Sequence, residues 1–335
     1  MRAISVNGEV EAESLGFVLP HEHVYADARF LCQAPSRPAT KVADIPQASL
    51  RASPMNFVDN LDMRDESAVT SELDQFVLAG GKTLVELTTI DLGRDPNLLR
   101  RVSSTTGLNL IMSTGYYVGR AHPAALHKIS VERIAREFEL DIRQGRNGIR
   151  AGVIGEIGTD DPLDPREARV VRAAAQAHLS TGCPVNIHFA AKCHEVLNVL
   201  RIMEDEGVRD FSRIVVSHMD VAIDLIQQKE VAARGAMVEY DTFGHEGYPD
   251  SKGNLMPQDE DRVAALSALA SWGLLKNVLV SHDVCLKSLW HRYGGRGYDN
   301  LLSRIRPMMT AAGLGDLEQH QLFVTNPARV FAFLK

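Results

Sequence analysis

The sequence predicts a single α/β domain, a (β/α)8 TIM barrel, and two observations carry that prediction. Short runs of aliphatic and β-branched residues recur along the 335 residues, each nearly continuous in its hydrophobicity, as in parallel strands buried on both faces. Amphipathic helical stretches separate most of these runs, and right-handed crossovers would close such units into a barrel. A doubly wound open sheet is the alternative, but no GxGxxG follows the first run.

Eight apolar runs are expected to be the barrel strands. They span residues 16–20, 82–87, 109–113, 151–156, 184–188, 213–218, 236–241 and 277–283. Three of the intervening helices are expected at 67–79, 131–143 and 165–179, where apolar residues recur with helical spacing. Glycine follows many of the helices just before the next strand, where it readily takes a left-handed cap.

Two segments stand outside this repeat, although residues 1–335 are expected to form one domain. Asn7-Gly8 lies between two short strand-like pieces and predicts an N-terminal hairpin within 1–14, covering the bottom of the barrel. Residues 24–66 are expected to form a long loop insertion after the first strand. Its least regular part, 31–54, is interpreted equally well as a lid over the site or as a floppy surface insertion.

Composition excludes several classes of function. The formal net charge is −7 and no basic cluster appears, so nucleic acid is not an expected partner. No signal peptide or apolar run of membrane length is present, so we expect a cytoplasmic enzyme without membrane contact. The four cysteines lack CxxC spacing and are expected to be free thiols, and Cys285 is expected to pack.

Polar side chains gather where the expected strands end. In an extended segment His21 and His23 face the same way, with Glu22 opposite. Strand ends in a barrel converge on one mouth, which also brings in Glu156, His188, His218 and Asp283. Any one of these could be a packing histidine or a helix-capping aspartate, but six together would be costly to bury without cations. The set can hold two divalent ions, bridged by the Glu156 carboxylate.

The chain resembles the phosphotriesterase family of the amidohydrolase superfamily from about Gly16 to Phe333. The matching phrases are Leu19-Pro20-His21-Glu22-His23, Gly93-Arg94-Asp95-Pro96, Thr114-Gly115-Tyr116-Tyr117, Val280-Ser281-His282-Asp283, Tyr293-Gly294-Gly295-Arg296-Gly297-Tyr298 and Asn326-Pro327-Ala328-Arg329. The resemblance implies a metal-dependent hydrolase with a binuclear centre and a homodimer. It assigns His21, His23 and Asp283 to the more buried ion, and His188 and His218 to the other.

One departure from the family pattern affects the expected activity. The best-known members bridge their metals with a carboxylated lysine on the fourth strand, whereas this strand ends in Gly155-Glu156-Ile157-Gly158. The chain therefore resembles the glutamate-bridged branch called phosphotriesterase-related proteins, and the activity that names the family does not simply transfer. Zinc is the first expectation for the two ions, with manganese or cobalt as alternatives.

The expected chemistry is attack of a metal-bridging hydroxide on a carbonyl or phosphoryl centre. Asp283 is expected to bind metal and also to carry the proton to the leaving group. The leading substrate is a small ester-type molecule, a lactone or carboxyl ester, with weak phosphotriesterase side activity. An amide hydrolase acting on an N-acyl substrate is the alternative, and a non-catalytic ligand-binding barrel is the third interpretation.

Loops after the strands are expected to contact the substrate. The resemblance places an aromatic position at Tyr116 or Tyr117 near the substrate, and only one of the two can face inward. Asp241 and His245 are expected to be polar contacts after the seventh strand, with Tyr248 beside them. Gly244 and Gly247 could let this loop move.

Four further features leave alternatives open. Asp220 is expected either to extend a proton relay from His218 or to cap the next helix. Arg94 is expected to form an ion pair toward Asp95, with anion binding as the other interpretation. His282 faces away from Asp283 and is expected behind the ligands. The last loop, from Trp290 through 293–298, is where an apolar leaving-group pocket is expected.

Overall fold

The computed structural model describes residues 1–33, 40–190, 194–250 and 252–335. Eight parallel strands form one sheet in sequence order, β3(Val18–Glu22), β4(Thr83–Glu86), β5(Asn109–Thr114), β6(Val153–Thr159), β7(Val185–Phe189), β8(Ile214–Val216), β9(Met237–Tyr240) and β10(Val278–Val280). The first and last strands lie together, and Asp283 N donates to His21 O at 3.1 Å. The expected barrel is confirmed.

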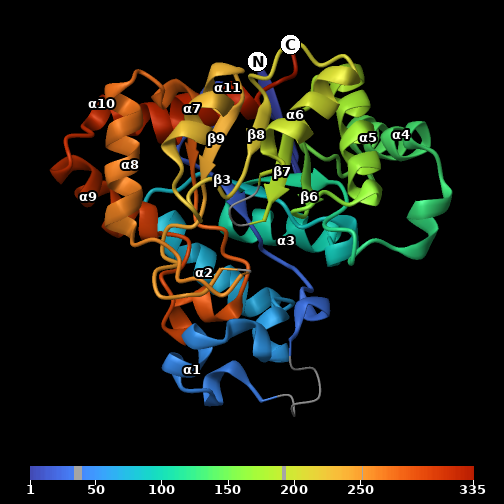
Figure 1. Cartoon of the computed structure of the whole chain (residues 1–335). Helices are drawn as coiled ribbons and strands as arrows, with labels where there is room; N and C mark the ends of the chain where they lie inside the picture. The colour runs from blue at the N-terminus through green and yellow to red at the C-terminus, as the bar shows by residue number, and fades with distance from the viewer. Residues whose placement is uncertain (34–39, 191–193, 251) are drawn as a thin grey trace.

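Helices follow the strands and cover the outside of the barrel (Figure 1). They are α1(Gln47–Ala52), α2(Glu66–Leu78), α3(Pro96–Thr106), α4(Val131–Arg143), α5(Pro165–Thr181), α6(Val196–Asp205), α7(Leu225–Ala233), α8(Asp259–Ser271), α9(Arg306–Ala311), α10(Asp316–His320) and α11(Asn326–Phe331). Asp164 caps α5 with a capping box, and Gly182 ends the same helix in the left-handed conformation. The helix expected at 131–143 is confirmed at both ends.

The N-terminal hairpin pairs β1(Arg2–Ser5) with β2(Gly8–Glu11), so the expected Asn-Gly turn is confirmed. Val6 N donates to Leu110 O at 2.9 Å, near the start of β5. The hairpin therefore lies at the amino-terminal end of the strands, as expected. Figure 1 shows both termini at this end, opposite the arrowheads of β6 and β7.

The insertion after β3 lies at the other end of the barrel, beside the loops that follow β9 and β10 (Figure 1). Its described part contains α1 and several 3-10 turns. Lys287 Nζ pairs with Asp59 Oδ1 at 2.9 Å, and Asn60 Oδ1 accepts a hydrogen bond from Ser288 N at 2.8 Å. The described part is thus packed against the last loop, whereas residues 34–39 of the expected lid lie outside the described residues. Movement as a lid stays a prediction.

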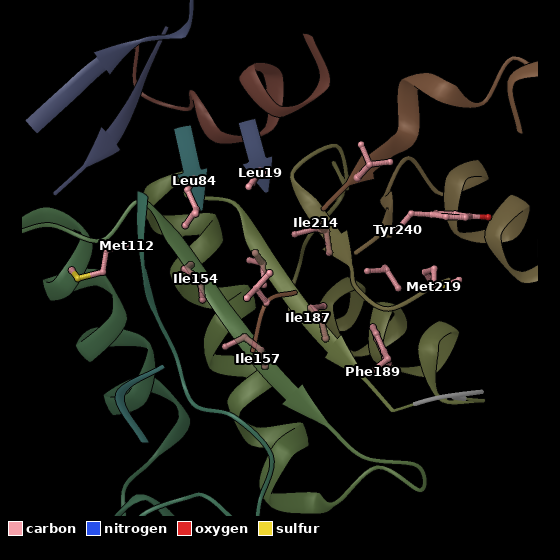
Figure 2. Close-up of a cluster of buried hydrophobic side chains, with 14 of the residues drawn as sticks. Leu19, Leu84, Met112, Ile154, Ile157, Ile187, Phe189, Ile214, Met219 and Tyr240 are labelled. Atoms are coloured by element: carbon pink, nitrogen blue, oxygen red, sulfur yellow. The ribbon is translucent and has the colours of Figure 1, made fainter. Parts of the chain in front are cut away.

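Two layers of apolar side chains alternate along the strands. Val85 and Val215 belong to one buried cluster with the hairpin and α11, whereas their neighbours belong to a second cluster under the helices. Figure 2 shows Ile154 and Ile157 of β6 in this second cluster, although they are three residues apart. The pairing of β6 with β7 shifts register between these two residues. Such a bulge re-aims the intervening side chain, Glu156, toward the barrel axis.

In the four described ranges, no helix is long and apolar enough to span a bilayer. Cys32, Cys183 and Cys285 are free thiols, as expected, and Cys193 lies outside the described residues.

Candidate metal centre

The six side chains expected to form the centre meet at the carboxyl-terminal mouth of the barrel. Three overlapping groups of potential ligand atoms connect them: His21, His23 and Glu156; His21, His218 and Asp283; and Glu156, His188 and His218. Glu22 points away from this cluster, and its carboxylate accepts hydrogen bonds from Ser281 and His282. The expected alternation of His21, Glu22 and His23 is therefore confirmed.

Glu156 divides its two oxygens between two pairs of imidazoles. Oε1 lies 3.4 Å from Nε2 of His21 and 3.4 Å from Nε2 of His23. Oε2 lies 2.6 Å from Nδ1 of His188 and 3.6 Å from Nε2 of His218. A carboxylate that supplies one oxygen to each of two neighbouring cations has this arrangement.

Several of the converging atoms lack hydrogen bonds. Within the described residues, His21 Nε2, Glu156 Oε2 and Asp283 Oδ1 are buried and have no hydrogen-bond partner. Asp283 Oδ1 lies 3.4 Å from His23 Nε2, on the Oε1 side of Glu156. Buried polar atoms of this kind are rare unless something else satisfies them. Nitrogen and carboxylate oxygen are the donors that zinc and similar divalent ions take, so the donor set fits such ions.

The electrostatics of the cluster favour positive charge. Burial lowers the pKa of His23, but Asp283 and Glu156 outweigh that effect and raise the pKa to about 10. Burial likewise opposes the charge on His21, yet Asp241, Glu156 and Glu239 leave its pKa well above its ordinary value. Carboxylates that attract protons this strongly also attract metal cations.

Three residues at or beside the expected ligands have positive φ angles, which orient the ligand side chains. Gly155 has φ of +139°, and a side chain there would collide with the Asn186 carbonyl. Only glycine therefore fits immediately before Glu156. His218 and Asp283 have φ of +60° and +49°, a conformation that non-glycine residues rarely adopt. Such residues often lie at functional sites, where the surrounding structure holds them in place.

A model of the phosphotriesterase family matches residues 1–331. The chain belongs to the phosphotriesterase family. This is a family of hydrolases with binuclear metal centres, so the expected fold and family are confirmed and the protein is a hydrolase.

Relatives span the whole chain. It is 33% identical over 341 residues to a protein named N-acetyltaurine hydrolase from Xenopus tropicalis, covering 98% of this chain and 97% of that one. The structure of a resiniferatoxin-binding protein from Rhodobacter sphaeroides is similar, with a TM-score of 0.93, 33% identity and coverage of 99% and 95%. A phosphotriesterase homology protein from Escherichia coli, complexed with phosphate in its active site, has a TM-score of 0.81, 29% identity and coverage of 95% and 99%.

The two tyrosines after β5 separate as expected, and only Tyr117 reaches the cluster. Its hydroxyl lies 3.3 Å from His188 Nε2, and its ring centroid lies 6.5 Å from that of Phe30 in the insertion. Tyr116 instead turns toward α4, where its hydroxyl donates to Glu137 and its ring packs on Phe138. Tyr116 thus packs away from the cluster, and contact with substrate stays a prediction for Tyr117 and for Tyr116.

Asp241 and His245 lie behind the metal-facing atoms rather than in the mouth. Asp241 is fully buried and accepts hydrogen bonds from His218 N at 3.0 Å and from His218 Nδ1 at 2.9 Å. His245 Nε2 lies 3.2 Å from Asp283 O. Both residues therefore hold parts of the cluster, and their direct contact with substrate stays a prediction. Tyr248 is also buried, and its hydroxyl donates to Ser288 O.

Asp220 and Arg94 belong to buried ion pairs. Asp220 accepts hydrogen bonds from Arg262 Nε at 2.8 Å and Thr242 N at 3.0 Å, while Asp224 caps the next helix. Neither the relay from His218 nor the capping role fits these contacts. Arg94 pairs with Asp141 at 2.6 Å rather than toward Asp95 or a free anion.

The remaining expectations have mixed outcomes. His282 Nδ1 lies 2.9 Å from Glu22 Oε1, so its expected place behind the ligands is confirmed. Trp290 and Tyr298 are fully buried, so these rings of the last loop pack inside the protein instead of lining an open pocket. The Cys285 thiol is half-buried and lies close to Asp283, so it borders the centre.

Sequence reasoning missed three residues around the centre. Phe30 is 41% exposed beside Tyr117, and Asp91 accepts a hydrogen bond from Tyr117 N at 3.0 Å. Oε2 of Glu239 lies 2.9 Å from Nδ1 of His21. A signal for Glu239 was present, because strand alternation places it on the same face as Asp241.

Proposed function

We propose that this protein is a binuclear metal-dependent hydrolase that cleaves the amide bond of a small N-acyl substrate. The observation that carries the hydrolase chemistry is the division of the Glu156 oxygens between two pairs of histidines. His21, His23 and Asp283 would hold one ion and His188 and His218 the other, with Glu156 between them. Zinc suits these ligands best, because four imidazoles and two carboxylates match its usual donors.

The ions would supply an acidified water near neutral pH and polarise the substrate carbonyl. Asp283 Oδ1 lies 3.4 Å from Nε2 of His23, at the same point, so its carboxylate could take the proton of the attacking water. The same carboxyl would then deliver the proton to the departing nitrogen. That delivery matters more for an amide than for an ester, because an amine leaves only once it is protonated.

Tyr117 and Phe30 would form the wall against which the acyl group packs. Burial raises the pKa of the Tyr117 hydroxyl well above its ordinary value, and Glu156 and Asp283 raise it further. The hydroxyl therefore stays protonated at neutral pH and can donate a hydrogen bond to the substrate. Phe30 continues this wall toward solvent and is contributed by the insertion.

The choice of bond rests on the full-length relatives. From the sequence alone, esters and lactones are the first expected substrates and amides the second. Relatives at 33–35% identity across 98% of this chain are named N-acetyltaurine hydrolases, which supports an N-acyl amide. Attack on an ester would use the same residues, so ester and lactone cleavage are competing outcomes of the experiment.

The test is a matched panel offered to zinc- or manganese-loaded protein near pH 7. It contains N-acetyltaurine, an N-acyl amino acid, the corresponding acetate ester and several lactones. Free amine is measured with an amine-reactive dye, and acid release is followed in weak buffer. We expect amine release from an N-acyl amide, lost in Glu156→Gln and retained in Glu72→Gln, which alters a buried carboxyl that accepts His291 N.

Other results would overturn the proposal in distinct ways. Acid release from esters or lactones without amine release would make the protein an esterase or lactonase. Equal rates of hydrolysis in the wild type and Glu156→Gln would show that the metal centre takes no part in the reaction. Metal binding without turnover of any substrate, combined with tight binding of one of them, would favour a ligand-binding barrel.

A further inference from the structure

Glu239 is a fully buried carboxylate below the metal centre. It lies on β9, on the same face as Asp241. Its Oε2 meets donors from three other strands of the barrel. These are His21 Nδ1 at 2.9 Å, Asn186 Nδ2 at 2.8 Å and Ser217 Oγ at 2.9 Å, whose single proton also faces Asn186 Oδ1 at 2.7 Å. A single oxygen thus ties β3, β7 and the end of β8 to β9.

The contact with His21 decides which nitrogen of that ring faces the centre. Nδ1 faces Glu239 at 2.9 Å and Asp241 at 3.1 Å. Nε2 faces Glu156 and has no hydrogen-bond partner in the described part of the chain. An imidazole held through one nitrogen by a carboxylate presents its other nitrogen to a metal with fixed orientation and raised basicity.

Asp241 does not make Glu239 redundant. Asp241 also accepts two hydrogen bonds from His218, at its backbone N and its Nδ1, so it is shared between two imidazoles. Within the described residues Glu239 contacts no second histidine, and its other hydrogen-bond contacts are the neutral side chains of Asn186 and Ser217. Its second oxygen, Oε1, has no partner within the described residues.

This burial would be hard to explain by packing. Burial of a carboxylate is unfavourable unless it is well paired, and within the described residues hydrogen bonds reach only one of the two oxygens of Glu239. An apolar side chain of similar size would fill the same space at lower cost. Burial of the negative charge becomes favourable once a cation is bound on the other side of His21.

We infer that Glu239 is a positioning residue that holds His21 for the more buried ion, with Asn186 and Ser217 fixing the carboxylate in turn. The inference rests on the proposed metal centre but concerns a residue outside the six ligands. Removal of Glu239 should therefore weaken metal binding more than it weakens the fold. A third ion between His21, Glu239 and Asp241 is the competing interpretation, since their atoms also lie close together.

The experiment compares the wild type with Glu239→Gln and Ser217→Ala. Glu72→Gln is the matched control, a buried glutamate that accepts His291 N at 2.8 Å and Arg292 N at 3.1 Å. Zinc affinity is measured by competition with a chromophoric chelator, and melting temperature is measured with and without zinc. The visible spectrum of the cobalt-loaded protein reports the geometry around the ion.

We expect zinc to bind Glu239→Gln about 10- to 100-fold more weakly at the tighter site. The melting temperature of the metal-free protein should match that of the control, the rise on adding zinc should shrink, and the cobalt spectrum should change. Ser217→Ala should show the same effects more weakly, and it keeps the test available if Glu239→Gln does not fold.

Two results would overturn the inference. Zinc affinity within twofold of wild type, with an unchanged cobalt spectrum, would show that Glu239 does not position His21. Three tightly bound ions in the wild type, falling to two in Glu239→Gln, would make Glu239 a ligand. A wild type that binds no zinc would instead contradict the proposed function, so the two failures are distinguishable.

Discussion

Nδ1 of His188 lies 2.6 Å from Oε2 of Glu156, yet this oxygen has no hydrogen-bond partner in the described part of the chain. The two atoms are close without the geometry of a hydrogen bond. Lone pairs that converge in this way suit a shared cation better than a shared proton. The relationship makes Glu156 the residue on which the account of the metal centre depends.

Glu156→Gln should lose the bridge. An amide supplies one oxygen and one nitrogen that donates, so only one of the two ions keeps its carboxylate oxygen. We expect bound metal to fall from two ions per chain to one or fewer, and kcat/KM to fall by at least about 100-fold. Elemental analysis after gel filtration and steady-state kinetics measure the two effects. Full metal content together with wild-type activity would rule out a bridging role.

Tyr117 and Phe30 should affect substrate binding in different ways. Tyr117→Phe removes the hydroxyl beside His188 but keeps the ring, so kcat should fall by about 10-fold with little change in stability. Phe30→Ala removes an exposed ring, so KM should rise while kcat is kept. Steady-state kinetics on the preferred substrate separate the two cases. An unchanged KM in Phe30→Ala would show that the insertion does not contact the substrate through this residue.

Arg262 should be the most stabilising ion-pair residue outside the centre. It is fully buried and pairs with Asp220 at 2.8 Å and Asp259 at 3.2 Å. Arg262→Met would leave the buried Asp220 carboxylate without its cation, whereas Asp259 keeps its pair with Arg304, and the loss at Asp220 should cost about 3 to 5 kcal/mol of unfolding free energy. Urea denaturation measures the loss. Arg133→Ala, which breaks an exposed pair with Glu137, should cost at most about 0.5 kcal/mol under the same conditions.

Asp91 should make stability depend on pH below neutrality. Burial, aided by Glu156, raises the pKa of this carboxyl from 3.8 to about 6. The folded protein therefore holds a proton that the unfolded chain releases, and the contribution of Asp91 to stability falls as pH rises from about 4 to about 6. Asp91→Asn has no ionisable group at this position, so its stability does not undergo this fall.

Relative to wild type, Asp91→Asn should gain about 1 to 3 kcal/mol of unfolding free energy between pH 4 and pH 7, at about 1.4 kcal/mol per pKa unit. Urea denaturation of metal-free protein at four pH values measures the difference, and the variant shares every other titrating group with the wild type. A difference that does not vary with pH would show that Asp91 ionises normally in the fold.

Much of this architecture could be read from the sequence. The strands are continuous apolar runs because both faces are buried, and the metal-facing residues follow them directly because strand ends converge in a barrel. The six metal-facing residues could be placed at one mouth on this basis, whereas the grouping of His21, His23 and Asp283 around one ion came from the family resemblance. Gly155 is visible in the sequence directly before Glu156. The reason that glycine is needed there, the nearby carbonyl of Asn186, is visible only in the structure.

The features that the sequence could not predict depend on contacts between segments that are far apart in the chain. The bulge that turns Glu156 inward is a register shift between β6 and β7, which no local pattern encodes. The sequence predicted Asp241 as a polar contact after the seventh strand, but it could not show that His218 would donate to its carboxylate. Arg94 likewise pairs with Asp141, 47 residues away in the sequence, rather than with a neighbour in its own loop.

The most direct test of the metal centre is an anomalous difference map from zinc-loaded crystals, collected on both sides of the zinc absorption edge. We predict two peaks about 3.5 to 4 Å apart, one next to each Glu156 oxygen. The peak near Oε1 should contact His21, His23 and Asp283, and the peak near Oε2 should contact His188 and His218. A single peak, or peaks away from Glu156, would contradict the account.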